Sequence, residues 1–93
     1  MTEFEWDPAK AKTNLAKHGV DFEVAKEVFL DRAAILQPDD SNPDEQRWSI
    51  IGLAGGRVLF VVVTERDNDV TRIISARKAN KREERDYFGQ ATP

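Results

Sequence analysis

The residues best suited to chemistry in this chain are one histidine and several arginines. His18 is the only histidine among the 93 residues, and imidazole is the side chain whose ordinary titration lies nearest neutral pH. Arg66 and Arg77 each stand at the end of an expected strand. A guanidinium group presents a planar fork of donors that can bind a phosphate through two hydrogen bonds. These residue types predict proton transfer and anion binding.

Each of these residues also has a structural interpretation. His18 lies where a helix is expected to end, and a cation there interacts favourably with the helix dipole. Arg72, close to Arg66 across an expected hairpin, could instead form a surface salt bridge with Glu65. Tyr87 could stack on a base of a nucleic acid or simply anchor the last helix to the core. The sequence leaves both interpretations of each residue open.

Composition predicts one small cytoplasmic domain covering residues 1–93. The chain has no cysteine, so disulfides and thiolate metal ligands are excluded, and a reducing compartment is favoured. No apolar run approaches the roughly 20 residues of a membrane helix, and no signal segment begins the chain. Phosphate-binding glycine loops, HExxH and carboxylate triads are also missing. We therefore expect no membrane partner, no metal and no cofactor.

Charge is divided unevenly along the chain. The net charge is -3, yet residues 71–88 hold six Lys or Arg and three Asp or Glu, which sums to +3 and leaves -6 for the rest. The six cations are Arg72, Arg77, Lys78, Lys81, Arg82 and Arg85. A chain with this division can present a cationic surface to a polyanion and offer the same surface to an acidic inhibitor.

The secondary-structure elements that must position these residues are expected in the order strand, two helices, four strands and a final helix. We expect strands near residues 4–6, 33–36, 47–53, 57–65 and 70–78, and helices over 8–17, from 22 onward, and 80–88. The polar segment 38–44 is expected to be a loop. Short separators at 54–56 and 66–69 predict hairpins, and the wholly apolar segment 58–63 predicts a central strand. The fold class is therefore α+β, with two helices packed on an antiparallel sheet.

Two expectations concern side-chain directions. The two N-terminal helices are expected to pack together through Leu15, Phe22, Val28 and Phe29. Strict alternation along the last strand predicts one face with Thr71, Ile73, Ser75 and Arg77, and the opposite face with Arg72, Ile74, Ala76 and Lys78. Because the helices should bury one face, only one of these sets can line an open surface, and the set with Ser75 and Arg77 is preferred.

Three separated motifs resemble a known family. Residues 4–8 read Phe-Glu-Trp-Asp-Pro, residues 17–20 read Lys-His-Gly-Val, and residues 72–79 read Arg-Ile-Ile-Ser-Ala-Arg-Lys-Ala. Lys12 and Asn14 lie between the first two motifs, and Phe22 follows the second. These motifs are similar to those of the BrnT ribonuclease toxins of bacterial type II toxin–antitoxin modules, and the resemblance extends from Phe4 to Tyr87. It implies a RelE-like fold and a metal-independent endoribonuclease that inhibits translation.

The resemblance also implies partners. A BrnA-type antitoxin with a ribbon-helix-helix domain would neutralise the toxin, RNA would be the substrate, and operator DNA would be contacted only through the antitoxin complex. The alternative is a catalytically inactive toxin-fold protein that serves as an interaction partner or co-repressor. A lone histidine and a net negative charge keep this alternative open.

Ribonuclease chemistry suggests a role for each candidate residue. Such an enzyme removes a proton from the ribose 2′-hydroxyl, stabilises charge at phosphorus and protonates the leaving oxygen. His18 and Glu65 are the candidates for proton transfer, and Arg66 and Arg77 for binding the scissile phosphate. Candidate RNA-binding residues are Lys17, Arg72, Lys78, Arg82, Arg85 and Tyr87.

Overall fold

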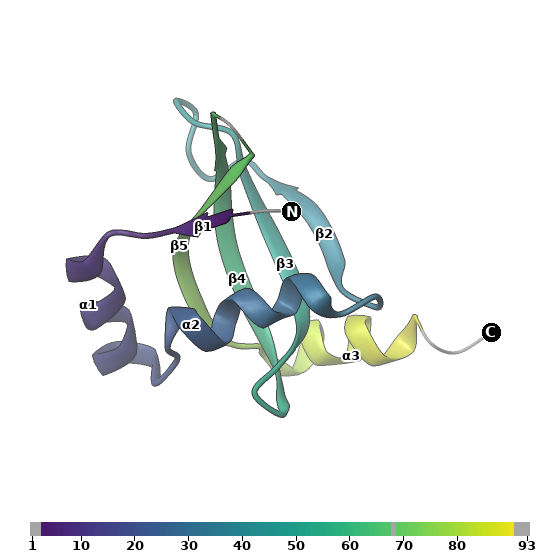
Figure 1. The fold of residues 1–93 in the computed structure, drawn as a ribbon. Coiled ribbons are helices and arrows are strands. Elements are labelled where there is room, and N and C mark those ends of the chain that lie inside the picture. Colours follow the sequence, from purple (N-terminus) through teal and green to yellow (C-terminus); the bar gives the residue numbers. More distant parts are fainter. Residues whose placement is uncertain (1–2, 68, 91–93) are drawn as a thin grey trace.

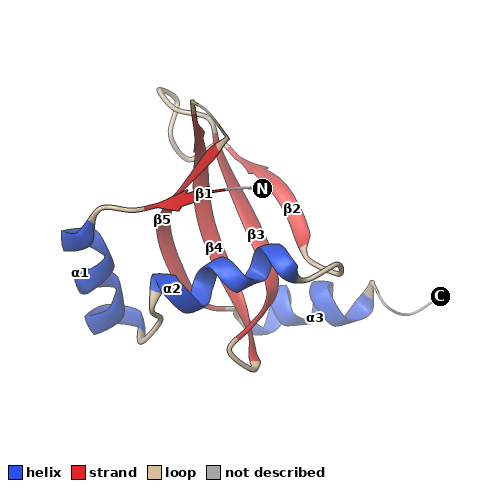
Figure 2. Cartoon of the chain, in the orientation of Figure 1, coloured by secondary structure: helices blue, strands red, loops and turns tan. Residues whose placement is uncertain are grey.

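The computed structural model describes residues 3–67 and 69–90. Its elements are β1 (Glu3–Glu5), α1 (Pro8–His18), α2 (Phe22–Ala25), the 3-10 helix η1 (Lys26–Leu30), β2 (Ile35–Asp39), β3 (Arg47–Ala54), β4 (Arg57–Arg66), β5 (Val70–Lys78) and α3 (Lys81–Gly89). The strands form one sheet in the order β1-β5-β4-β3-β2. Helix α2 with η1 crosses one face of this sheet, α1 stands beside β5, and α3 lies on the opposite face (Figures 1 and 2). In the described part of the chain, none of the helices has the length and hydropathy to cross a membrane.

Helix α1 begins and ends where the sequence predicts. The Asp7 carboxylate accepts a hydrogen bond from the N–H of Ala9 at 2.9 Å, and Pro8 occupies the first turn, where its missing N–H has no consequence. Gly19 ends the helix with φ 69°, a left-handed conformation that glycine adopts without strain. The prediction of a helix over residues 8–17 is confirmed, with His18 as its last residue.

The second helix is shorter than its sequence pattern suggests. Asp21 caps it by accepting from the N–H of Glu23 at 2.8 Å, but after one α-helical turn it tightens into η1. Phe22 and Val28 are buried as expected. The expected contact between the two helices through Leu15 and Phe29 is wrong, because both side chains are exposed. Helix α1 packs beside strand β5 instead of against α2.

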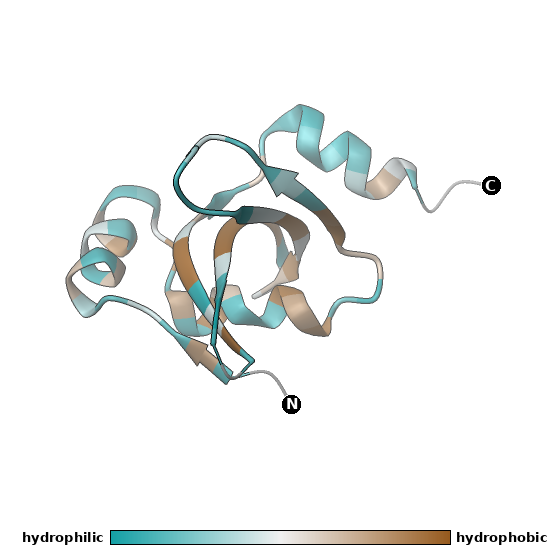
Figure 3. Ribbon diagram, turned by 90° about the horizontal axis from the view of Figure 1, so that it is seen from above, coloured by the Kyte–Doolittle hydropathy of each residue, from teal (hydrophilic) through white to brown (hydrophobic). Residues whose placement is uncertain are grey.

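The core lies between α2–η1 and the sheet, and β4 is its central strand. Leu59, Val61 and Val63 of β4 point to this face and are buried. Gly52 of β3 allows η1 to come close, since a Cβ at this position would lie 3.1 Å from the Cβ of Val28. A smaller cluster under α3 covers the other face and consists of Ile51, Val58, Ala79 and Tyr87. Figure 3 shows apolar stretches on the central strands and on α2–η1, whereas α1 and α3 are largely hydrophilic.

Two features of the sheet differ from the predictions. Strand β1 pairs in parallel with β5, so the sheet is mixed and not wholly antiparallel. The strand expected at residues 33–36 is β2 at Ile35–Asp39, where Pro38 pairs with Trp48 although it was assigned to a loop. A proline fits here because β2 is an edge strand, and its outer side needs no N–H donor.

A β-bulge in β5 overturns the predicted alternation. Val62 pairs with Ser75 and the next residue, Val63, pairs with Ile73, so Ile74 has no partner of its own on β4. The extra residue reverses the alternation beyond it. Arg72, Ser75 and Arg77 therefore share the face of β4 that carries Phe60, Val62 and Thr64. Ile73 and Ala76 are buried toward the helices instead.

Candidate functional site

The guanidinium of Arg77 is fixed on the sheet face that α3 partly covers. It donates to the two carboxylate oxygens of Glu83 at 2.8 and 2.9 Å and to the carbonyl of Lys78 at 3.2 Å. Its central carbon lies 4.2 Å from the ring centroid of Phe60, a cation–π contact. The hydrogen bonds to Glu83 raise the pKa of Arg77 despite its partial burial. Three of its five N–H donors are engaged by described residues, which leaves two for a ligand.

Glu83 connects this arginine to the start of α3. Its carboxylate accepts from the N–H of Asn80 at 2.9 Å, while the Asn80 side chain accepts from the N–H of Glu83 at 2.8 Å. These reciprocal bonds form a capping box. The hydrogen bonds from Arg77 lower the pKa of Glu83, and they outweigh the effect of burial. The carboxylate therefore stays ionised at neutral pH, and its role is to hold Arg77.

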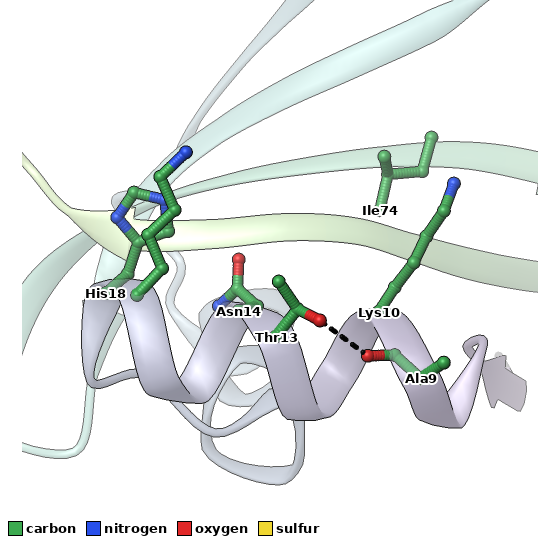
Figure 4. Close-up of a pocket in the computed structure, with 7 residues that line it drawn as sticks. Ala9, Lys10, Thr13, Asn14, His18 and Ile74 are labelled. Atoms are coloured by element: carbon green, nitrogen blue, oxygen red, sulfur yellow. Dashed lines mark hydrogen bonds between the residues drawn. The ribbon is translucent and has the colours of Figure 1, made fainter.

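A groove of about 340 Å³ lies between α1 and β5. We call it the basic groove, and its lining residues are Ala9, Lys10, Thr13, Asn14, Lys17, His18 and Ile74. Lys10, Asn14, Lys17 and His18 recur at helical spacing and so share one side of α1. Figure 4 shows the Lys10 and His18 side chains extending from this side of the helix past β5, with Ile74 near the tip of Lys10. The groove contains three basic side chains and no acidic one.

Asn14 holds the basic groove together. The side chain is buried, donates to the carbonyls of Val20 at 3.1 Å and Ala76 at 2.8 Å, and accepts from the N–H of Ala76 at 3.2 Å. This amide thus pairs with β5 in the manner of a neighbouring strand, beyond the point where β1 ends. The position of α1, and of the cations on it, is therefore fixed relative to β5.

The cations at the two ends of the sheet differ in their partners. Near the β4–β5 turn, Glu45 pairs with Arg47 at 3.0 Å and with Arg66 at 3.7 Å, and Glu5 pairs with Arg72 at 2.7 Å. The alternative of a salt bridge between Glu65 and Arg72 is not what the structure shows, since β1 brings Glu5 to this arginine.

Several cations at the opposite end have no carboxylate partner in the described part of the chain. Among residues 3–67 and 69–90, no carboxylate comes within 4.0 Å of the charged groups of Lys10, Lys17, Arg57 or Lys78. Arg57 donates to the carbonyl of Gly19 at 3.0 Å and so lies beside the end of α1. The end of the molecule that holds the basic groove therefore carries several positive charges without a described carboxylate partner.

The structure brings some predicted site residues together and separates others. His18 and Lys17 line the basic groove, whose floor is Ile74 of β5, while Arg77 and Lys78 follow on the same strand. Arg66 pairs with Val70, whereas Arg77 pairs with Phe60. Six residues of β4 thus separate the two arginine sites, about 20 Å. Arg66 and Arg77 form two sites, as the hairpin geometry predicts.

The remaining predicted residues lie elsewhere. Glu65 is exposed beside Arg66 in a small hollow at the β4–β5 turn, far from the basic groove. Arg82 and Arg85 are exposed on α3. Tyr87 is buried, and its hydroxyl donates to Asp31, so its side chain anchors α3. In the described residues, no three His, Asp or Glu side chains cluster so as to hold a metal ion.

Comparison with known proteins identifies the family. Residues 6–83 match the family model described as the ribonuclease toxin BrnT of type II toxin–antitoxin systems. The chain belongs to the BrnT family. A crystal structure of the ribonuclease toxin BrnT from Brucella abortus is similar, with 30% sequence identity and a TM-score of 0.70 over 87% of this chain and 100% of that one. A search of curated protein sequences gives no match.

Membership of the BrnT family confirms the resemblance seen in the sequence and the general function, that of a ribonuclease toxin. The chain is a toxin-family ribonuclease of a type II system, which implies RNA as substrate and an antitoxin as partner. Sequence reasoning about the site missed Glu83 and Lys10. The Asn80-x-x-Glu83 pattern was a visible signal of a capping box, but the contact of Glu83 with Arg77 depends on how α3 folds back. Lys10 could have been found from its helical spacing to Lys17.

Proposed function

We propose that this BrnT-family chain is a metal-independent endoribonuclease that cleaves RNA in the cytoplasm and thereby inhibits translation. Its inhibitor on this proposal is a BrnA-type antitoxin with a ribbon-helix-helix domain, and the complex of the two binds operator DNA through the antitoxin. The family supports ribonuclease activity and an antitoxin. The more specific parts of the proposal are supported by the charge distribution and by the side chains around β5.

The observation that carries the proposal is the gathering of unneutralised cations at one end of an acidic protein. The chain has a net charge of -3, yet Lys10, Lys17 and Lys78 lie at the end where no described carboxylate neutralises them. Each phosphodiester of RNA carries a negative charge, and a cationic surface of this kind attracts such a polyanion. Arginines are paired with carboxylates at both ends of the sheet, so it is the lysines that carry this contrast.

Two residues at this end have the chemistry that RNA cleavage needs. His18 is exposed at the end of α1, and its imidazole is of the type that serves as a general acid or base. Arg77 keeps two donors for a phosphate while Glu83 and Phe60 hold its plane in place. A guanidinium fixed in this way stabilises charge that grows on the phosphate oxygens during transfer. Glu65 and Arg66 lie at the opposite end of β4, and the proposal leaves them outside the catalytic group.

Incubation of antitoxin-free protein with a defined RNA in excess EDTA tests the proposal. The comparison uses the wild type, Arg77→Ala, and Arg32→Ala as a matched control, because Arg32 is exposed and distant from β5 in the sequence. Circular dichroism establishes that each variant is folded. We expect cleavage by the wild type and Arg32→Ala and a loss of at least about a hundredfold in Arg77→Ala. Intact RNA with all three proteins would contradict the proposal and favour a catalytically inactive binding partner of the antitoxin.

A further inference from the structure

The basic groove contains two residues, Lys10 and Ile74, to which the catalytic proposal assigns no contact with RNA. Lys10 and Lys17 lie on one side of α1, two helical turns and about 10 Å apart along its axis. The other two polar residues of the lining are already engaged: Asn14 binds backbone groups, and the hydroxyl of Thr13 donates to the carbonyl of Ala9 at 3.0 Å. Only the ammonium groups and His18 are left to meet a ligand, so the ligand is an anion.

The floor of the groove is apolar because of the β-bulge. Ile74 is the extra residue of β5, and it lines the groove beside the Lys10 side chain. In a regular strand, Ile74 would alternate with Ile73 and have a partner on β4. The bulge instead directs the aliphatic side chain into the groove, where it is half-buried. An anion that fits here therefore has an apolar surface between its charges.

We propose that the basic groove binds a segment of the RNA strand next to the cleavage site, with Lys10 and Lys17 on phosphates and a base against Ile74. The separation of the two lysines along α1 places them on different phosphates of one strand. The groove adjoins β5, the strand that carries Arg77, so one strand of RNA can reach both. This inference rests on the proposed function, since it assigns part of the same substrate to a new site.

Lys12 provides a matched control for Lys10. Both are exposed lysines of α1, but Lys12 is two residues further on, which turns it about 200° around the helix and away from the groove. Replacing either lysine with alanine changes the net charge by the same amount. A difference between the two variants therefore reports the location of the charge and not its sum.

Fluorescence anisotropy with a labelled single-stranded 2′-O-methyl RNA tests the inference. This probe has no 2′-hydroxyl to attack, so binding is measured without cleavage. We expect Lys10→Ala to bind about fivefold more weakly at low salt and to reduce the slope of log K against log salt by about 0.7, the value for one lost phosphate contact on a single strand. Lys12→Ala should match the wild type in both quantities. Ile74→Ala should weaken binding and leave the salt slope unchanged.

The outcomes separate the two proposals. Equal binding by Lys10→Ala and Lys12→Ala, with a wild type that binds and cleaves RNA, would overturn the groove and leave the ribonuclease intact. A wild type that neither binds the probe nor cleaves RNA would overturn both. If Lys10→Ala binds RNA normally but loses the antitoxin, the groove accepts an acidic protein segment and the inference is wrong. Thermal melting shows whether Ile74→Ala is folded, and the lysine pair tests the groove independently of it.

Discussion

The carboxylate of Glu83 holds the guanidinium of Arg77 and caps helix α3 at the same time. The two hydrogen bonds to Arg77 measure 2.8 and 2.9 Å, and the bond from the N–H of Asn80 measures 2.9 Å. The side chain of Glu83 is only 14% exposed. The position of Arg77 on the sheet thus depends on the first turn of α3, so a change in that turn alters the orientation of the guanidinium.

Replacing Glu83 with glutamine should impair RNA cleavage more than it impairs folding. Glutamine keeps one acceptor oxygen but loses the charge and one of the two hydrogen bonds to Arg77, which frees the guanidinium to rotate. We expect kcat to fall about tenfold or more, with KM little changed, and the free energy of unfolding to fall by about 1–3 kcal/mol. Steady-state cleavage and urea denaturation measure the two effects.

Glu84→Gln is the control for this change. Glu84 is the next residue of α3, and it makes no ion pair with another described residue. Its replacement should leave kcat unchanged. A similar loss of kcat in both variants would mean that negative charge on α3, and not the contact with Arg77, is what matters.

Glu83 and Asp31 should both make stability depend on acidic pH. Hydrogen bonds from Arg77 lower the pKa of Glu83 below 4.5. Burial raises the pKa of Asp31, but hydrogen bonds from Tyr87 and from two backbone N–H groups lower it overall, below 3.8. A lowered pKa stabilises the fold above the unfolded value, and this stability is lost as the pH falls through the folded value. Urea midpoints should therefore drop steeply below about pH 4, and Glu83→Gln should show a shallower drop. Parallel curves for the two proteins would contradict this assignment.

Tyr87 should titrate at an unusually high pH. Its hydrogen bond to Asp31, together with burial, raises its pKa to about 12. Because Tyr87 is the only tyrosine of the chain, the ultraviolet absorbance of phenolate reports this one group. A raised pKa stabilises the fold fully below the unfolded value of 10.0, and this stability is lost as the pH rises toward 12. Asp31→Asn removes the charge and should move the absorbance midpoint back toward 10.0. A wild-type midpoint near 10 in folded protein would refute the contact.

Local sequence signals predicted where the helices and strands lie. Contacts between residues distant in the sequence decided which side chains share a face of the sheet. Asp7 with Pro8, and Gly19 after His18, indicate helix ends because capping depends on neighbouring residues only. The bulge at Ile74 has no such signal, since neither a glycine nor a proline marks it. Strict alternation therefore separated Arg72 from Arg77, and the structure places them on one face.

The candidate site was predictable in its residue types and less so in its connections. Arg77 and His18 could be chosen as candidates because guanidinium and imidazole have distinctive chemistry, and their roles stay predictions. The partner of Arg72 was not, because Glu5 reaches it only when β1 pairs in parallel with β5, a contact across 67 positions of sequence. Such pairings depend on the whole fold and not on local propensity.

Asn14 should contribute more to stability than any other polar residue of α1. Its amide makes three hydrogen bonds with buried backbone groups. Two of them are with Ala76, which is 62 positions away in the sequence. Asn14→Ala leaves the two carbonyls and the N–H without a partner, and we expect the free energy of unfolding to fall by about 2–4 kcal/mol. Urea denaturation measures this change. RNA binding should weaken as well, because α1 would no longer be fixed against β5.

Thr13→Ala and Asn14→Asp complete this test. The Thr13 hydroxyl bonds only to its own helix, at an exposed position, so its removal should change the unfolding free energy by less than about 0.5 kcal/mol. Aspartate has the shape of asparagine but accepts hydrogen bonds only, and it would face the carbonyl oxygens of Val20 and Ala76. Asn14→Asp should therefore be at least as destabilising as Asn14→Ala at neutral pH. If aspartate were tolerated there, the amide could not be the donor that joins α1 to β5.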